Sequence, residues 1–527
     1  MGRSTRSRRR GPPAKRTAGD TAPRALALDQ AGVSTGLPRR APADGTRNPR
    51  SPESSHAPRR LATPAQWWPK IPPELLILCC LAAATRLMGI TYPHAIVFDE
   101  VYFREYALRY LEGKYYFDLH PPLGKLLLAG WAKLVGVSAT AASTDPAVVL
   151  RVLPALAGTA LVAVFYLLLR ELSASRRVAT FGGALLLLDN AILVESRLIL
   201  VDSMLLLFGT GALTCYLAAR SRTGRSQWML LTASAVLAGM AASTKWTGLT
   251  ALGVILLVWV AGTLRCRVSW RLALPQVAVL VLVPILVYVG VFAVHFRLLS
   301  HSGPGDAYMS SQFQSTLVGN PHYDPAARMS FIDKFMELNK AMRSYELSLD
   351  NSTHPYSSSW ISWPIMKRPV YYWVGNTTTP GAQGYIYLLG NPVIWWGLVV
   401  GVVAVAVGWM RHPQLFDGHR GGMAVLGLAW VANFAPFAAI QRPMFLYHYF
   451  FSFLFCLAAV SLGGGLLAGW ISDDKRVWRF PSRRSAALYW GILGIALVGF
   501  VFFAPLSYGL PLTDGGLAQR MWLGSWR

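Results

Sequence analysis

The sequence predicts an all-α membrane protein that crosses the bilayer many times, and three observations support this prediction. Of the 527 residues, 53% are hydrophobic and only 14% are charged, whereas soluble domains carry roughly 25% charged residues. Many apolar runs approach the roughly 20 residues that a helix needs to cross hydrocarbon. Arginine and lysine also gather in short links between these runs, as they do in cytoplasmic loops.

About eleven of these runs are predicted to span the membrane. Five short basic links fall on the same side as the basic N-terminal segment, so this side is predicted to be cytoplasmic. The outer side then receives two long segments, 92–146 and 297–382, and the C-terminus. The predicted spans are 74–91, 147–170, 178–190, 196–219, 228–243, 247–264, 273–296, 383–410, 421–440, 444–470 and 487–508.

The chain divides into three parts by composition. Residues 1–70 hold 15 Lys or Arg against 4 acids and lack apolar periodicity, which predicts a disordered basic cytoplasmic tail. Residues 71–510 form the predicted transmembrane domain, and 511–527 an outer C-terminal tail. The net charge of +25 does not indicate a nucleic-acid partner, because no recognition module accompanies it. Membrane topology and contact with lipids explain the charge better.

The first outer segment is predicted to contain two helices. It reads VFDEVYFREYALRYLEGKYYFDLHPPLGK from residue 97. Asp99 or Glu100 begins the first helix and Gly113 ends it, because glycine is a common C-terminal cap. Pro121 and Pro122 begin the second helix, since proline suits a first helical turn. The second outer segment is predicted to be mostly irregular and, because of its length, functional.

Four titratable residues of the first outer segment could carry acid–base chemistry: Asp99, Glu100, Asp118 and His120. One interpretation of Asp99 and Glu100 is an N-cap followed by a first-turn acid. The other is a general base that takes a proton from an incoming hydroxyl. Capping is also open for Asp118 and His120, which precede a helix start. All four return to one predicted surface, as an acid–base site requires.

The segment 188–203, LDNAILVESRLILVDS, places ionisable residues at membrane depth. Such residues usually face a cavity or each other. Glu195 and Asp202, seven residues apart, are predicted to share one helix face, while Arg197 points elsewhere and could bind a phosphate. A purely structural Glu-Arg-Asp network among Asp189, Glu195, Arg197 and Asp202 is the alternative.

Cations at the outer ends of the spans could neutralise a phosphate leaving group. Lys245 and Arg442 end spans on the predicted outer side, and Arg86, Arg197 and His354 add positive charge. The alternative for Lys245 and Arg442 is an anchor that snorkels to the membrane surface.

An aromatic cluster in the second outer segment also has two interpretations. It forms either an interfacial belt or a surface on which a sugar stacks. The sequence contains no Asp-x-Asp pair, no phosphate-binding glycine-rich loop and no zinc spacing, and its five cysteines match no disulfide pattern. A nucleotide-sugar site is therefore not indicated. The cluster consists of Trp360, Trp363, Tyr371, Tyr372 and Trp373.

The order of six motifs resembles that of protein O-mannosyltransferases, and the chain resembles the actinobacterial members of this family over roughly 74–510. The motifs are FDEVYF, YYFDLHPPLGK, LDNAILVESRLILVDS, TKWTGL, HPYSSSWISWPI and FLYHY. The resemblance implies a C-type glycosyltransferase fold, polyprenyl-phosphate-mannose as the donor, and Ser/Thr hydroxyls of exported proteins as acceptors. It also implies a multi-pass protein of the plasma membrane whose active site lies on the outer face.

The resemblance implies roles for individual acids. The family's acidic pair corresponds to Asp99 and Glu100, and its second acidic site to Asp118 beside His120. We hypothesise that Asp99 is the general base of an inverting transfer and that Glu100 assists it. Asp118 and His120 are then expected to shape the acceptor site.

The resemblance also implies which cations bind the donor phosphate. The family's arginines correspond to Arg86 and Arg197, and its later His-Pro motif to His354. Arg197 is predicted to hold the phosphate, and Arg86, His354 and Arg442 are predicted to support it.

Two departures from many eukaryotic relatives concern acceptor recognition. Tyr102 and Arg104 stand where those relatives have His and Gly after the acidic pair, and the second outer loop is too short for their β-trefoil insertion. Two other functions stay open: a lipid-phosphate-sugar transferase with a glycan or lipid acceptor, and a transporter. No cofactor beyond the lipid donor is predicted, while a divalent metal ion and partnership with the export translocon are left open.

Overall fold

The computed structural model describes residues 71–137, 146–350, 352–471 and 478–527. The predicted basic tail, 1–70, lies outside the described residues. The described chain is mostly helical, with one small sheet. The helices are α1 (Pro73–Leu87), α2 (Glu100–Glu112), α3 (Leu123–Leu134), α4 (Pro146–Glu171), α5 (Arg176–Leu187), α6 (Asn190–Arg197), α7 (Asp202–Arg220), α8 (Gly224–Thr244), α9 (Leu249–Arg265), α10 (Trp270–Leu298), α11 (Ser311–Gln314), α12 (Phe331–Ser348), α13 (Pro392–Arg411), α14 (Arg420–Phe434), α15 (Phe450–Leu467), α16 (Arg483–Tyr508) and α17 (Asp514–Ala518).

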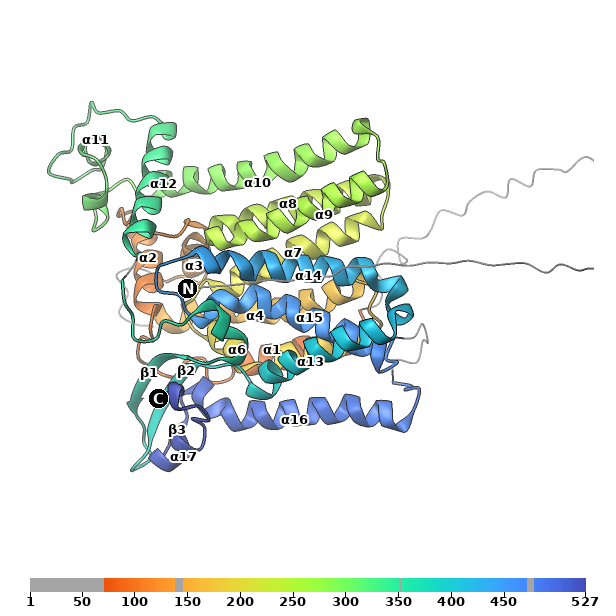
Figure 1. Cartoon of the computed structure of the whole chain (residues 1–527). Helices are drawn as coiled ribbons and strands as arrows, with labels where there is room; N and C mark the ends of the chain where they lie inside the picture. Colours follow the sequence, from red (N-terminus) through yellow and green to blue (C-terminus); the bar gives the residue numbers. More distant parts are fainter. Residues whose placement is uncertain (1–70, 138–145, 351, 472–477) are drawn as a thin grey trace, which may run out of the picture. The chain divides into compact units, whose positions relative to one another are not determined.

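The long apolar helices lie side by side in a bundle (Figure 1). Within the described ranges, eight helices are long and apolar enough to cross a membrane, or nine if the bent pair α5 and α6 counts as one span. The prediction of about eleven spans is therefore too high by this criterion. The segments predicted at 74–91 and 228–243 are helical, as α1 and α8, but they are not among the eight, and α1 has only 15 residues.

The span predicted at 196–219 is broken rather than continuous. Helix α6 ends at Arg197 and α7 begins at Asp202, while α5 and α6 meet at an angle of 63°. A residue from another helix stabilises the break, because the backbone N–H of Ile199 donates to the carboxylate of Glu100 at 2.8 Å. The predicted shared helix face of Glu195 and Asp202 is consequently wrong, since the two residues lie on different helices.

The connecting segments divide between the two ends of the bundle. Helices α2, α3 and α12 and the small sheet gather at one end, which we call the loop end (Figure 1). The arginine-bearing connections α4–α5, α7–α8, α9–α10 and α13–α14 lie at the other, which we call the link end. This division agrees with the predicted sorting of basic links to one side.

The first outer segment folds as predicted. Helix α2 starts directly after Asp99 and stops at Gly113, whose φ of +72° is the left-handed conformation that glycine adopts without strain. Helix α3 follows Pro122. The loop end is thus organised by two short helices with capped or proline-marked ends.

The second outer segment is more ordered than predicted. It contains the 18-residue helix α12, which runs across the loop end rather than along the bundle (Figure 1). It also contains strand β1 (Val370–Asn376), which pairs antiparallel with β2 (Gln383–Leu388), and β2 pairs with β3 (Pro511–Leu512). The span predicted to start at residue 383 therefore begins as a strand, and the helix α13 starts at Pro392.

The C-terminal segment, predicted as an outer tail, packs against the rest of the described chain. The Trp526 side chain is buried, and its indole N–H donates to the backbone carbonyl of Met366 at 2.7 Å. The Arg520 guanidinium donates to the carbonyl of Phe502 at 2.7 Å. Residues 511–527 accordingly pack on the sheet and α16.

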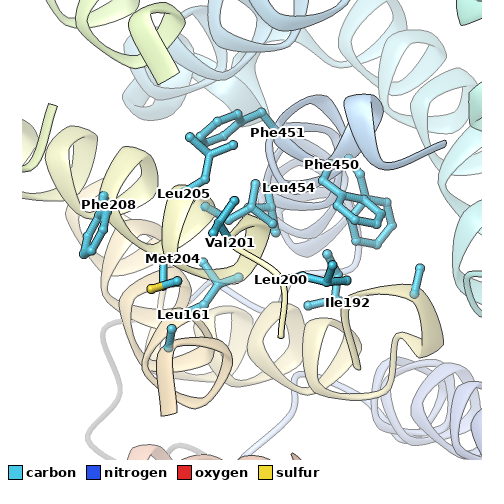
Figure 2. Packing of buried hydrophobic residues seen from close by; sticks show 14 of the residues in the cluster. Leu161, Ile192, Leu200, Val201, Met204, Leu205, Phe208, Phe450, Phe451 and Leu454 are labelled. Atoms are coloured by element: carbon cyan, nitrogen blue, oxygen red, sulfur yellow. The ribbon is translucent and has the colours of Figure 1, made fainter. Parts of the chain in front are cut away.

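The core lies where α4, α7 and α15 meet. Figure 2 shows Leu161 of α4, Met204 and Leu205 of α7, and Leu454 of α15 converging in one apolar cluster. A Cβ atom at Gly209 would lie 2.5 Å from the far end of the Phe451 ring, so the glycine leaves room for this side chain between α7 and α15. The ends of these two helices carry part of the site described next.

Candidate active site

Asp99 stands at the junction of a tight loop and α2. The preceding residue, Phe98, has φ of +50°, which is uncommon for a residue other than glycine. The Phe98 ring stacks on Tyr372 at 4.1 Å between centroids, and this contact holds the unusual backbone. The Asp99 carbonyl accepts the first helical hydrogen bonds, but its carboxylate accepts none from any described residue. The carboxylate is therefore available to a substrate.

The surroundings of Asp99 favour its protonated form. Burial raises the pKa of the Asp99 carboxyl to about 6, and the nearby carboxylates of Asp202 and Asp118 add to this rise. The Lys245 ammonium opposes it. A carboxylate with a pKa near the working pH is suited to general base catalysis, because it is both largely ionised and able to hold a proton.

Glu100 has the opposite surroundings. Its carboxylate is fully buried and accepts hydrogen bonds from the Arg151 guanidinium at 2.7 Å to each oxygen. It also accepts from the backbone N–H groups of Val97 at 2.9 Å and Ile199 at 2.8 Å. With both oxygens accepting hydrogen bonds, Glu100 is less available to a substrate than Asp99, and its share in catalysis stays a prediction. It ties the Asp99 loop to α4 and to the break before α7.

Asp118 pairs with a lysine that the sequence analysis did not weigh. The buried Lys125 ammonium donates to the Asp118 carboxylate and to the backbone carbonyl of His120. Burial lowers the pKa of Lys125, and Asp118 opposes this shift. The pKa of His120 is lowered well below its usual value, by burial first and then by Lys245 and Lys125. His120 is hence a neutral imidazole at neutral pH.

A cavity of about 290 Å³ lies at the loop end, between α7, α9, α14 and α15. Two ion pairs stand in its wall: the Lys245 ammonium donates to Asp202 at 2.7 Å, and Arg442 lies 3.1 Å from Glu346. His120 contributes a neutral polar group. The apolar part of the wall consists of Leu205, Leu206, Ala432, Pro436, Phe437, Ile440, Phe450 and Phe451.

This cavity combines two cations with an extended apolar wall. Each cation is already paired with one carboxylate, and burial raises the pKa of Glu346 despite the opposing charge of Arg442. An incoming anion could therefore compete for Lys245 and Arg442, while an apolar chain contacts the opposite wall. Such a site suits a molecule with an anionic head and a hydrocarbon tail.

Two of the arginines predicted to bind phosphate lie next to the end of α1. Arg197 donates to the carbonyls of Arg86, Met88 and Gly89 at 2.6 to 2.9 Å, and its guanidinium lies over the Tyr508 ring. These carbonyls end α1, so Arg197 caps that helix, and its phosphate contact stays a prediction. Arg86 is buried next to it and donates to Thr85 at 2.9 Å, while its other two guanidinium nitrogens have no hydrogen-bond partner among the described residues. Neither arginine lines the cavity.

The other two predicted phosphate ligands differ from each other. Arg442 lines the cavity, as described above. The His354 ring lies edge-on against Phe445, with 4.9 Å between centroids, and its Nδ1 accepts the N–H of Tyr356 at 3.2 Å. His354 is thus close to the 442–448 segment but outside the cavity wall.

The ionisable residues of 188–203 separate into two groups. Asp189 caps α6 and accepts from Ile192 N–H and the Trp395 indole, and Glu195 accepts from Tyr372 at 2.6 Å. These contacts are not the predicted Glu-Arg-Asp network, because Arg197 donates to backbone carbonyls at the end of α1. Asp202 joins the cavity instead.

Sequence reasoning missed three residues that shape this site. Arg151 was a single cation in an apolar span, which is a signal for a buried ion pair. Lys125 stood inside a quoted motif, seven residues after Asp118. Glu346 gave no signal, because α12 was not predicted. In the described part of the chain, no group of three or more His, Cys, Asp or Glu side chains could hold a metal ion.

These observations define a multi-pass helical membrane protein with an acid- and cation-bearing site at one end of its bundle. Residues 76–300 match the family described as dolichyl-phosphate-mannose-protein mannosyltransferase, and residues 331–526 match the C-terminal four-transmembrane region of protein-O-mannosyltransferase. The chain belongs to the protein O-mannosyltransferase family.

Similar proteins agree with this assignment. Protein O-mannosyltransferase 1 of Drosophila pseudoobscura is 39% identical over 267 residues, which are 46% of this chain and 29% of that protein. Dolichyl-phosphate-mannose--protein mannosyltransferase 1 of Saccharomyces cerevisiae is 33% identical over 270 residues, or 47% of this chain and 33% of that protein. The matched region thus spans about a third of these relatives. Because they are eukaryotic, the actinobacterial subtype stays a prediction.

The fold also matches a solved structure. A chain of the S. cerevisiae protein O-mannosyltransferase Pmt1-Pmt2 complex, solved bound to the sugar donor, superposes with a TM-score of 0.76. The match covers 87% of this chain and 93% of that chain at 20% identity. The predicted fold class, a polytopic helical membrane protein of the glycosyltransferase type, is confirmed.

Proposed function

We propose that this protein transfers mannose from a polyprenyl-phosphate-mannose to Ser or Thr hydroxyls of polypeptides. The observation that carries the proposal is the Asp99 carboxylate, which has no hydrogen-bond donor of its own among the described residues and a pKa of about 6. It lies near a cavity that offers two cations and an apolar wall. Membership of the family supports the same reaction.

The reaction balances with these residues alone. The acceptor hydroxyl oxygen bonds to C1 of mannose while the bond from C1 to the phosphate oxygen breaks, with inversion at C1. Asp99 takes the hydroxyl proton. The departing lipid phosphate gains the electron pair, and Lys245 and Arg442 stabilise its charge. Asp202 and Glu346 orient these two cations before the donor arrives.

The cavity wall suggests how the lipid donor is held. The phosphate would bind between Lys245 and Arg442, and the polyprenyl chain would follow the phenylalanine and leucine side chains toward the membrane. His120, being neutral, can hydrogen-bond to the sugar without competing for the proton. Asp118, fixed by Lys125, keeps His120 in place through the shared lysine.

We further propose that the loop end faces the outside of the plasma membrane. The link end carries the arginine-rich connections, which the positive-inside rule assigns to the cytoplasm. Acceptors would then be exported polypeptides, and the export translocon is the expected neighbour because it delivers them unfolded.

A transfer assay in detergent tests the function. Purified protein is mixed with polyprenyl-phosphate-[³H]mannose and a Ser/Thr-containing peptide, and a matched peptide with Ala at every Ser and Thr is the control. Mannose should pass to the first peptide only, with inverted configuration at C1. Transfer to added glycan or lipid but to neither peptide would support the alternative acceptor. Absence of transfer, together with gradient-driven movement of the donor in vesicles, would favour a transporter.

A further inference from the structure

We propose that the acceptor polypeptide binds in extended form along the free edge of β1, as an additional strand of the small sheet. The inference rests on the proposed function, because it assigns the acceptor of that same site. It concerns recognition through the backbone, which would explain how one site accepts hydroxyls in differing sequences.

Strand β1 has one unpaired edge. The sheet order is β1–β2–β3, so β1 hydrogen-bonds to β2 on one side only. Within the described ranges, no backbone hydrogen bond from another segment reaches residues 370–376 on the other side. Val370 and Tyr372 are buried, whereas residues 373–376 are half-buried or exposed, so the outward backbone groups at this end of the strand are available to a partner chain.

This edge also lacks the usual protection against pairing. Proteins commonly place charges or proline on an exposed edge strand. The seven residues of β1, VYYWVGN, contain neither, and Val374 is 42% exposed. An uncharged edge strand of this length is a template for β-augmentation, in which a peptide adds main-chain hydrogen bonds to a sheet.

Two aromatic contacts fix β1 to the loop that carries Asp99. Tyr372 stacks on Phe98, the residue before Asp99, and donates its hydroxyl to Glu195 at 2.6 Å. Trp373 packs edge-on against Tyr92 of the same loop, with 6.0 Å between centroids. The strand therefore cannot move independently of the catalytic carboxylate. A polypeptide that pairs with β1 is placed in register with Asp99.

Strand geometry explains why this arrangement suits Ser/Thr acceptors. Successive residues of an added strand rise by about 3.3 Å and point to alternate faces, and the strand would lie about 4.8 Å from β1. A hydroxyl on the face toward Asp99 can react, whereas its neighbours point away. Shifting the peptide by two residues would present the next hydroxyl without changing the backbone contacts.

Cysteine cross-linking tests this placement. Val374→Cys is treated with an acceptor peptide that carries one cysteine two residues from its Ser, under mild oxidation. Val318→Cys is the matched control, because Val318 is 43% exposed and belongs to the segment after α11, on the far side of the loop end from β1 (Figure 1). We expect a cross-link at position 374 that excess cysteine-free peptide competes away, and at least tenfold less at position 318. Equal labelling, or none at position 374, would overturn the proposal.

Backbone methylation of the peptide gives a second, independent readout. Single N-methyl groups are placed along an acceptor peptide, and the KM for transfer is measured with wild-type protein. Strand pairing predicts that methylation at every second residue raises KM about tenfold, the loss of roughly one hydrogen bond, while the intervening positions change it little. A uniform or absent effect would contradict strand addition. If no peptide accepts mannose at all, the proposed function fails, whereas the cross-link still reports whether the edge binds a chain.

Discussion

At the scale of single residues, Asp99 and Glu100 show how neighbours with the same functional group acquire different roles. The Asp99 carboxylate has a raised pKa and no hydrogen bond from a described residue, while Glu100 is buried against Arg151. Sequence placed both at a helix start but could not separate them. Only the long-range partners, Arg151 and Ile199, decide which acid is occupied, and no local pattern encodes those contacts.

The fall in kcat/KM at low pH should follow the protonation of Asp99. Because burial raises the pKa of this carboxyl to about 6, its ionised form dominates above pH 6 and disappears below it. We expect kcat/KM to fall about tenfold per pH unit below about 6 and to be level from 6 to 8. His120 does not produce this fall in kcat/KM, since burial and nearby cations lower the pKa of His120 well below its usual value. If the fall in kcat/KM below pH 6 persists in His120→Gln, the assignment to Asp99 is supported. If this fall disappears in His120→Gln, the assignment is contradicted.

Glu100→Gln should mainly lower the stability of the protein rather than act directly on the transfer reaction. The substitution leaves the Arg151 charge buried without its partner, which costs about 3–5 kcal/mol in comparable pairs. We expect a marked fall in the thermal unfolding temperature. Asp99→Asn is the matched control: the folded-state pKa of Asp99 is raised, so its ionised form destabilises the protein above about pH 6. Its removal should leave the unfolding temperature at pH 7 unchanged or higher. Equal losses in both variants would contradict the separation of roles.

Arg442 and Arg197 give a second contrast between binding and structure. Arg442→Gln should weaken donor binding about tenfold or more, the usual effect of losing a charged hydrogen bond. Glu346→Gln should leave donor binding equal or tighter, because it frees Arg442 from its ion pair. Arg197→Lys should lower stability and leave the donor Kd unchanged, since the hydrogen bonds and ring contact of the guanidinium reach the end of α1 and Tyr508. Direct titration with polyprenyl-phosphate-mannose measures the Kd of all three variants, and a weakened Kd in Arg197→Lys would support its predicted role.

At the scale of elements, the sequence predicts helices well and misses breaks and strands. Apolar length predicts α4, α7, α9, α10 and α13–α16 because a membrane helix needs little besides it. The break at 198–201 could not be predicted, since it depends on a hydrogen bond that the Ile199 N–H donates to Glu100, about a hundred residues away. The strand β1 was not predicted, because its aromatic residues fit an interfacial belt equally well. Its alternation is interrupted by a register shift between Tyr371 and Trp373.

At the scale of the whole molecule, the charges of the described chain divide between the two ends of the bundle. The link end holds the arginine-rich connections and the loop end holds the acids of the site. The sequence predicted this division correctly, because the positive-inside rule reads composition rather than contacts. It could not show that the residues near Asp99 come at once from α7, the end of α8, the loop before α3 and the 442–448 segment.

Cysteine accessibility should confirm which end faces outside. The native Cys266, exposed in the α9–α10 connection at the link end, is kept alone in one chain, and Val318→Cys at the loop end in another. A membrane-impermeant maleimide should label position 318 in intact cells and Cys266 only after permeabilisation. The reverse pattern would place the site on the cytoplasmic side.

The most direct test of the account is the single-turnover transfer rate of Asp99→Asn, measured with donor bound and a saturating Ser/Thr peptide. If Asp99 is the base, the rate should fall by about 10²–10⁴-fold while the donor Kd stays at the wild-type value and the unfolding temperature does not fall. A rate within a few-fold of wild type, in protein that binds donor normally, would contradict the assignment of the base and leave another group to take the hydroxyl proton.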